Sequence, residues 1–388
     1  MVGIRKEQAR RFLLMKNGLL GPGALRGREG VVDYVRQAGC VQYDPVDICG
    51  RSHELALLAR VKGFSRDMLE ELLYRGRELI EFFDKNLCIL STDDWPYLSF
   101  VRDTSRVRTR PALEPYLAEV LALMRERGTL CEQDLSAQPG MGRMALEMLY
   151  MRGEAVIHHR DGAQKIYAPA SAHLPAQLLD TADPFANAHE RQMWQVMRRI
   201  GAVGMLWDAS SDAWLGVDGL NAQARSEIFA ALTRLGVIMP VAVQGMSHPM
   251  FILSEDWPLL ESCREAAPAD RRVRLLPPLD CMLWDRRLIY ELFGFSYKWE
   301  IYTPEEQRRY GCYVLPVLMG EGFVGRVEPV IDRERDALVV RRFWPEEGVR
   351  VGDRFLWALE DALQTLQRFN GLGRLVWQEG WLQQNETF

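Results

Sequence analysis

An α+β fold is predicted by three observations on this chain of 388 residues. A glycine, an apolar strand, a turn and a second apolar strand recur three times in the first two-thirds of the chain. Apolar residues at helical spacing precede these recurring segments. Past about residue 270 the pattern changes to strands. We therefore expect three tandem copies of one helix-and-hairpin unit, followed by a β-rich domain.

The three recurring segments share one scheme, in which a glycine closes a helix and two apolar strands flank a turn. They occupy residues 74–90, 151–167 and 235–253. This arrangement is the wing of a winged helix, and its return at intervals of roughly eighty residues marks three copies of one supersecondary unit.

Helices are predicted from apolar periodicity ahead of the hairpins, over residues 30–38, 114–126, 142–151, 188–200 and 222–235. After the third copy we expect strands over 313–319, 323–327 and 337–344, then a helix over 351–369. Proline-containing joints at Arg110-Pro111 and Asp183-Pro184 suggest boundaries. The expected domains are winged helix 1 with the site motif, winged helices 2 and 3, and a β-barrel-like domain with a C-terminal helix, over 1–110, 111–182, 183–262 and 263–388.

Gln42 and Asp44 are the strongest candidates for chemistry, because one residue, Tyr43, separates them in an extended run that ends at Pro45. Side chains of an extended backbone alternate, so Gln42 and Asp44 would point the same way and Tyr43 the opposite way. A plainer alternative is that both residues cap a helix beginning near Val46, since Asp is a favoured N-cap ahead of proline.

This Gln-x-Asp run resembles the signature of the winged-helix DNA glycosylases of the AlkZ and YcaQ (AlkX) type, in the YcaQ-like branch. The block from Leu283 to Arg287 and the stretch over 294–316 are similar to the same family. The resemblance therefore covers nearly the whole chain, and it implies three winged helices held in a C shape by a β-barrel-like domain. Pro45, Asp47 and Glu54 depart from the family pattern, which leaves the range of substrates open.

The resemblance implies a monofunctional enzyme that hydrolyses the N-glycosidic bond of N7-alkylated purines in double-stranded DNA, with interstrand crosslinks among its substrates. Such hydrolysis passes through an oxocarbenium-like sugar, which a carboxylate such as Asp44 can stabilise while it helps to activate water. The amide of Gln42 can hold the water or the sugar-phosphate. The sequence contains no zinc motif, phosphate-binding glycine loop or dinucleotide fingerprint, so we expect no cofactor and no metal.

Candidate DNA-binding residues are basic side chains near the signature, in the run over 102–110, on the second hairpin and in the block that carries the family resemblance, namely Arg51, His53, Arg102, Arg106, His159, Arg160, Lys165, Arg286 and Arg287. The net charge of −5 opposes a DNA-binding function, because phosphate contacts require local positive charge. The run over 102–110 can instead be a charged linker, and the basic residues of the second hairpin can simply be solvated, without contact to DNA.

Seven scattered cysteines, with no paired or metal-ligand spacing, predict reduced core thiols. No stretch approaches the ~20 apolar residues of a membrane span, and the N-terminus lacks an apolar signal core. We expect a cytoplasmic, nucleoid-associated monomer with no membrane partner. The rival hypothesis is a non-catalytic winged-helix DNA-binding or regulatory protein, although three copies in one chain differ from a dimer that reads two half-sites.

Overall fold

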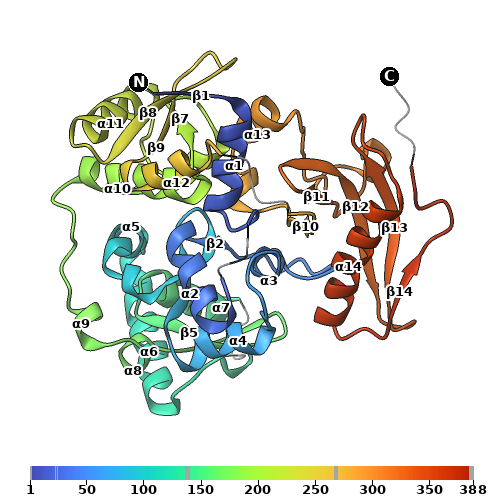
Figure 1. Cartoon of the computed structure of the whole chain (residues 1–388). Coiled ribbons are helices and arrows are strands. Elements are labelled where there is room, and N and C mark those ends of the chain that lie inside the picture. The colour runs from blue at the N-terminus through green and yellow to red at the C-terminus, as the bar shows by residue number, and fades with distance from the viewer. Residues whose placement is uncertain (1, 22, 24, 136–139, 266–269, 384–388) are drawn as a thin grey trace. The chain divides into compact units, whose positions relative to one another are not determined.

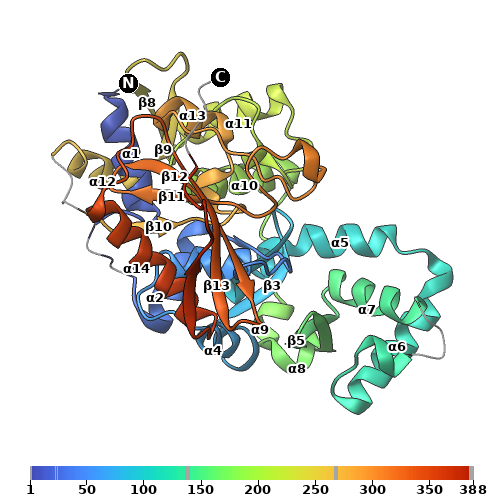
Figure 2. The ribbon, with the colours of Figure 1, turned by 90° about the vertical axis from the view of Figure 1, so that its right-hand side faces the viewer.

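The computed structural model describes residues 2–21, 23, 25–135, 140–265 and 270–383. The chain forms two compact units, which we call the terminal unit (residues 1–65 with 193–388) and the middle unit (residues 66–192). Each contains helices followed by antiparallel hairpins, so the expected mixed α+β fold is present (Figures 1 and 2).

The terminal unit begins with strand β1 (Val2–Ile4), helices α1 (Lys6–Lys16) and α2 (Gly27–Ala38), strand β2 (Val41–Gln42) and helix α3 (Ser52–Leu58). Helix α2 buries Val31, Val35 and Ala38 on one face, as the helical spacing predicts. It ends at Gly39, whose φ of 69° lies in the region that favours glycine. The expected helix is thus present and starts three residues earlier than predicted.

The second segment of the terminal unit is a small sheet with helices beside it (Figure 1). Strands β8 (Ile238–Val243) and β9 (Met250–Leu253) form the third expected hairpin, and β7 (Leu206–Trp207) pairs with β9. The unexpected strand β1 runs parallel to β8. The helices of this segment are α10 (Ala188–Val203), which belongs to this unit from Met193 onward, α11 (Ala222–Arg234) and α12 (Trp257–Ser262).

The C-terminal segment is a curled half-barrel sheet in the order β10-β11-β12-β13-β14 (Figure 2). Its strands are β10 (Val273–Leu275), β11 (Leu315–Met319), β12 (Gly322–Asp332), β13 (Ala337–Pro345) and β14 (Arg374–Trp377). Helix α13 (Arg286–Phe293) precedes β11, and helix α14 (Asp353–Phe369) contacts both edge strands, β10 and β14. Leu359, Leu363 and Leu366 of α14 share one apolar core with the sheet. The three predicted strands, observed as β11, β12 and β13, and the predicted helix are confirmed, whereas β10 and β14 were not predicted.

The middle unit contains the other two expected hairpins, β3 (Leu79–Phe83) with β4 (Leu87–Ser91) and β5 (Ala155–Asp161) with β6 (Gln164–Pro169). A π-helical turn (Glu71–Arg75) directly follows helix α4 (Arg66–Glu70). In the core of this unit, Phe82 contacts Trp95 and Tyr150 in an aromatic cluster. The helices are α4 (Arg66–Glu70), α5 (Ser99–Arg108), α6 (Glu114–Arg127), α7 (Met141–Met151), α8 (Ala170–His173) and α9 (Ala176–Leu179).

Short 3-10 turns connect the larger elements at Thr92–Asp94, Pro96–Leu98, Pro111–Leu113, Glu132–Leu135, Asp212–Trp214, Ser254–Asp256, Cys281–Leu283 and Glu305–Gln307. All seven cysteines lie in the described residues, none is in a disulfide, and five are buried, in agreement with the prediction of core thiols. Within the described ranges, no helix is both long and apolar enough to cross a membrane.

Candidate active site and an adjacent cavity

The segment that carries Gln42 and Asp44 alternates in burial as an extended chain does. Val41 and Tyr43 are buried, whereas Gln42 and Asp44 are half-buried. This is the period-two pattern predicted from the sequence, with the amide and the carboxylate on the more exposed side.

The Asp44 carboxylate accepts one hydrogen bond, from the backbone N–H of Val46 to Oδ1 at 2.8 Å. Burial raises the pKa of Asp44, and the Val46 N–H partly opposes this. No helix begins near Val46, since the next helix starts at Ser52, so the helix-cap alternative is wrong and the bond closes a local turn. No other described residue donates a hydrogen bond to the carboxylate, and the Gln42 amide makes none to the described part of the chain.

The loop that follows Asp44 is fixed to the half-barrel sheet. Ile331 of β12 donates its backbone N–H to the Ile48 carbonyl at 2.9 Å, and Asn370 Nδ2 donates to the Cys49 carbonyl at 2.9 Å. Val46, Ile48 and Cys49 also pack into the apolar core that the sheet forms with α14. The C-terminal segment therefore sets the position of the backbone just after the carboxylate.

The residues that precede the strand are held by two arginines of α10. Arg198 donates to the Gly39 carbonyl and stacks over Trp194, and the fully buried Arg199 lies with Nη1 3.8 Å from the Cys40 sulfur. A Cβ atom on Gly39 would lie only 2.7 Å from Arg198 Cγ. Glycine is therefore required here for two reasons, the close approach of Arg198 and the positive φ. Sequence reasoning missed both arginines, because nothing in their local pattern connects them to residues 39–40.

Tyr43 and His53 lie on the buried side of the same segment. Their rings stack with centroids 4.4 Å apart, and His53 is only 3% exposed. Arg51, expected to contact DNA, is half-buried with Nη1 3.8 Å from a carboxylate oxygen of the buried Glu54. In this structure the two basic residues nearest the signature pack against protein groups.

Tyr313 adds a buried phenol to this region. Its hydroxyl has no hydrogen-bond partner among the described residues, and its ring lies edge-on to Trp299 at 6.1 Å. Burial raises the pKa of Tyr313, and the nearby Asp44 carboxylate raises it further. The hydroxyl is therefore a neutral donor in the electrostatic field of the candidate carboxylate.

Two predicted DNA-binding arginines lie on α5 of the middle unit. Arg102 is buried, donates to the Trp95 carbonyl at 2.6 Å and stacks over the Trp95 ring at 4.5 Å. Burial and the charge of Arg106 lower the pKa of Arg102 to about 10. Arg106 is more exposed, but it pairs with Asp103 at 2.7 Å and donates to the Arg152 carbonyl at 2.8 Å.

The second hairpin carries the next group of predicted residues. Arg160 donates from Nε to both oxygens of the buried Glu81 at 3.0 Å, and Lys165 pairs with Glu147 at 2.7 Å. His159 is exposed, with its Nδ1 2.7 Å from Nδ1 of His158. Of the three predicted DNA-binding residues on this hairpin, His159 is the exposed one, whereas Arg160 and Lys165 are partly buried.

Arg286 and Arg287 begin helix α13 in the terminal unit, directly after the N-cap Asp285. Both side chains are about half exposed; Arg287 pairs with Glu291 at 2.9 Å and stacks over Trp207 at 4.5 Å. They are the most exposed cations of the predicted set in this unit.

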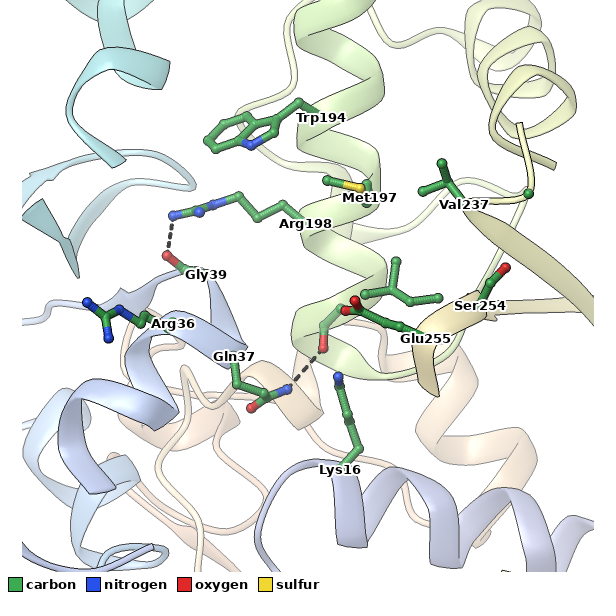
Figure 3. A pocket seen from close by; sticks show the side chains of 13 residues that line it. Lys16, Arg36, Gln37, Gly39, Trp194, Met197, Arg198, Val237, Ser254 and Glu255 are labelled. Atoms are coloured by element: carbon green, nitrogen blue, oxygen red, sulfur yellow. Dashed lines mark hydrogen bonds between the residues drawn. The ribbon is translucent and has the colours of Figure 1, made fainter. Parts of the chain in front are cut away.

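A cavity of about 470 Å³ lies beside the start of the candidate strand, and Gly39 is part of its wall (Figure 3). We call it the Gly39 cavity. Its other walls come from Lys16 at the end of α1, Arg36 near the end of α2, Trp194 and Met197 of α10, and the ends of β8 and β9. None of these residues was singled out in the sequence, since they are distant from one another along the chain.

No group of three or more His, Cys, Asp or Glu side chains within the described ranges is placed to hold a metal ion. A model of the AlkZ-like DNA glycosylase family matches residues 35–369. The fold is similar to that of the Streptomyces sahachiroi DNA glycosylase AlkZ, with a TM-score of 0.62 and 18% identity over 97% of this chain and 100% of that one. The family match spans most of the chain, including Gln42 and Asp44, and the chain therefore belongs to the AlkZ-like DNA glycosylases and is a DNA repair enzyme.

Proposed function

We propose that this DNA glycosylase hydrolyses the N-glycosidic bond of N7-alkylated purines in double-stranded DNA, as a monofunctional enzyme that uses Asp44 and Gln42. The observation that carries the proposal is the state of Asp44, which is half-buried and receives only the Val46 N–H among the described residues. Its remaining oxygen lone pairs can therefore face a sugar or a water molecule. The three helix-and-hairpin segments would serve as winged helices that bind the duplex.

The chemistry requires little from the protein because alkylation at N7 already gives the purine a positive charge. Such a base leaves without protonation, so the enzyme must mainly stabilise the sugar cation and supply water. Asp44 supplies the negative charge, and partial burial strengthens its interaction with the cation. Gln42, on the same side of the segment, can orient the water through its amide.

The test is single-turnover excision of 7-methylguanine from duplex DNA by Asp44→Asn. We expect the rate to fall by roughly 10²–10³-fold, because one preorganised electrostatic group is lost, with little change in DNA affinity. Gln42→Ala should be less severe. Asp47→Asn is a matched control, since Asp47 is an exposed carboxylate three residues further along. Near wild-type excision by Asp44→Asn, or an equal loss in the control, would remove the assignment.

Hydrolysis without a covalent intermediate is tested by its products. Excision should survive EDTA, release intact 7-methylguanine and leave an abasic site that breaks only on later alkali treatment. A protein-DNA adduct trapped by borohydride would instead show attack by an amine. Release of one arm of a nitrogen-mustard crosslink between opposing guanines, followed on a denaturing gel, tests whether crosslinks are substrates for base excision repair.

The exposed cations Arg106, His159, Arg286 and Arg287 are the proposed phosphate contacts. Replacing each arginine by alanine should weaken binding to damaged and undamaged DNA alike and lower the salt slope by about one. Arg102 is buried and Arg160 is partly buried, and both are hydrogen-bonded inside the middle unit, so replacing either should instead lower the stability of that unit. An effect confined to one lesion type would indicate base or shape recognition.

A further inference from the structure

Two buried hydrogen-bond donors of the terminal unit have no acceptor among the described residues. They are the hydroxyl of Tyr313, a side chain that is only 1% exposed, and Nε1 of Trp299. The two rings lie edge-on to one another, with their centroids 6.1 Å apart. Leaving a buried donor unpaired is costly, so such a group calls for an explanation, such as a bound water or a role in the reaction.

The loop that carries both rings is held in one conformation by the buried carboxylate of Glu300. This carboxylate accepts the backbone N–H groups of residues 309–311, at 3.1, 2.9 and 3.3 Å. Glu300 follows Trp299 directly, and residue 311 precedes Tyr313 by two positions, so these bonds restrain the backbone on which both rings are carried. The two donors therefore have fixed positions, as a role in positioning another group requires.

Tyr313 shares an apolar core with the loop that follows Asp44. Cys49 and Tyr313 both belong to the buried core of the half-barrel sheet, and Val46 and Ile48 pack against it. Val46 also donates its backbone N–H to Asp44 Oδ1 at 2.8 Å. One short segment thus joins the candidate carboxylate to the core that contains the Tyr313 ring.

Among the titratable groups close to the Tyr313 hydroxyl, Asp44 is the anion that acts on it most strongly. The four groups are Cys49, Tyr297, Asp44 and Asp47. Burial raises the pKa of Cys49 and of Tyr297, so both are neutral at pH 7. Asp47 is exposed to solvent, which screens its charge, and it acts more weakly than Asp44.

We propose that the Tyr313 hydroxyl and the Trp299 indole N–H hold one internal water molecule against the Asp44 carboxylate, which makes Tyr313 a positioning residue for the reaction. Neither donor bonds to the carboxylate directly, so a water is the group that can connect them. A buried water typically makes about three hydrogen bonds to groups that would otherwise be unpaired, and two donors with one carboxylate supply that number.

This arrangement leaves the carboxylate able to react. An ionised carboxylate has about four lone-pair sites, so the Val46 N–H and the internal water together leave about two for the sugar and the attacking water. The internal water lies on the protein side of Asp44 and is not the nucleophile. The inference rests on the proposed function, which it deepens by assigning a support to the reacting group.

The first test is the pH dependence of single-turnover 7-methylguanine excision by Tyr313→Phe, with spontaneous release subtracted. Hydrogen-bond donors stabilise the charged carboxylate, so losing this one should move the acid limb of the profile upward by about one pH unit and lower the plateau rate by about tenfold. Tyr310→Phe is the matched control, since Tyr310 lies on the same loop with its ring against Trp344, and its profile should match that of wild type. A slower Tyr313→Phe enzyme with an unmoved acid limb would mean a structural role only and would overturn the inference.

The second test asks whether the two donors act through one water. Trp299→Phe keeps an aromatic ring but removes the N–H, so it should also slow excision. The double variant Trp299→Phe/Tyr313→Phe should be little slower than Tyr313→Phe alone, because the water has already lost its site. An unchanged rate in Trp299→Phe, or rate losses that multiply in the double variant, would refute the shared water.

A third measurement does not depend on excision. In free protein labelled isotopically at its aspartate carboxyl carbons, the Asp44 signal, identified by its absence from Asp44→Asn, should titrate about one pH unit higher in Tyr313→Phe than in wild type. If wild-type protein releases no 7-methylguanine yet this difference is found, the proposed substrate is wrong and the positioning stands. If excision requires Asp44 but its titration is the same in both proteins, the reaction stands and positioning by Tyr313 is wrong.

Discussion

Removing Arg60 should destabilise the terminal unit by about 3–5 kcal/mol, the usual cost of breaking a buried ion pair. Its guanidinium donates to both oxygens of Asp280 at 2.7 Å and to the Asn17 carbonyl at 2.8 Å, and it stacks over Tyr34 at 4.7 Å. Both charged side chains are fully buried. Burial alone would lower the pKa of Arg60, but the charge of Asp280 raises it above its usual range, so the pair stays ionised. Arg60→Met leaves a buried carboxylate with no cation beside it.

The assay is reversible urea unfolding, supported by thermal melting, in which a loss of this size lowers Tm by about 10 °C. Arg264→Met is the matched control, because Arg264 pairs with Glu261 at 3.0 Å on the surface and should cost less than about 1 kcal/mol. The double variant Arg60→Met/Asp280→Leu should recover part of the loss, since it removes the unpaired charge. A double variant no more stable than Arg60→Met would refute the reasoning that the uncompensated carboxylate is the cause.

Four further predictions concern the site. Excision at saturating enzyme should decrease as the pH falls through the raised pKa of Asp44, because the carboxylate is the active form; a flat profile in acid would contradict this. The same shift means that the folded state favours protonated Asp44, so its contribution to stability is lost as the pH rises, and Asp44→Asn should melt no lower than wild type at neutral pH. Gly39→Ala should cost at least about 1–2 kcal/mol from its positive φ and displace Arg198, with slower excision; unchanged unfolding would contradict it. Tyr313→Phe should leave stability equal or higher, because its hydroxyl has no described partner, yet slow excision by about tenfold if that hydroxyl binds water or substrate; equal rates would remove it from the site.

Local periodicity predicted most of the longer helices and the hairpins, but it missed helices α1 and α5. The hairpin of β5 and β6 was predictable because its two apolar strands flank a turn at Gly162. Strands β1 and β10 were missed because each has only three residues and is stabilised by a distant partner, such as Val241 for Val2. Contacts of that kind, which also determine the division into compact units, leave no periodic trace in the sequence.

The candidate site shows the same limit at the level of single residues. The shared side of Gln42 and Asp44 followed from the period-two geometry of extended backbone. The sequence did not show which basic residues contact DNA and which form ion pairs inside the protein. An arginine such as Arg160 has the same local pattern whether its partner is a phosphate or the buried Glu81. The anchors Arg198 and Asn370 became visible only through their contacts with the backbone at Gly39 and Cys49.

The bond from Asn370 to the Cys49 carbonyl has a consequence for how the enzyme is made. The two residues are 321 positions apart, so this bond to the loop after Asp44 cannot form until nearly the whole chain has left the ribosome. At translation rates of about 5–20 residues per second, that wait lasts on the order of tens of seconds. A nascent or prematurely terminated chain therefore carries Gln42 and Asp44 without the bond from Asn370 that fixes the loop after them.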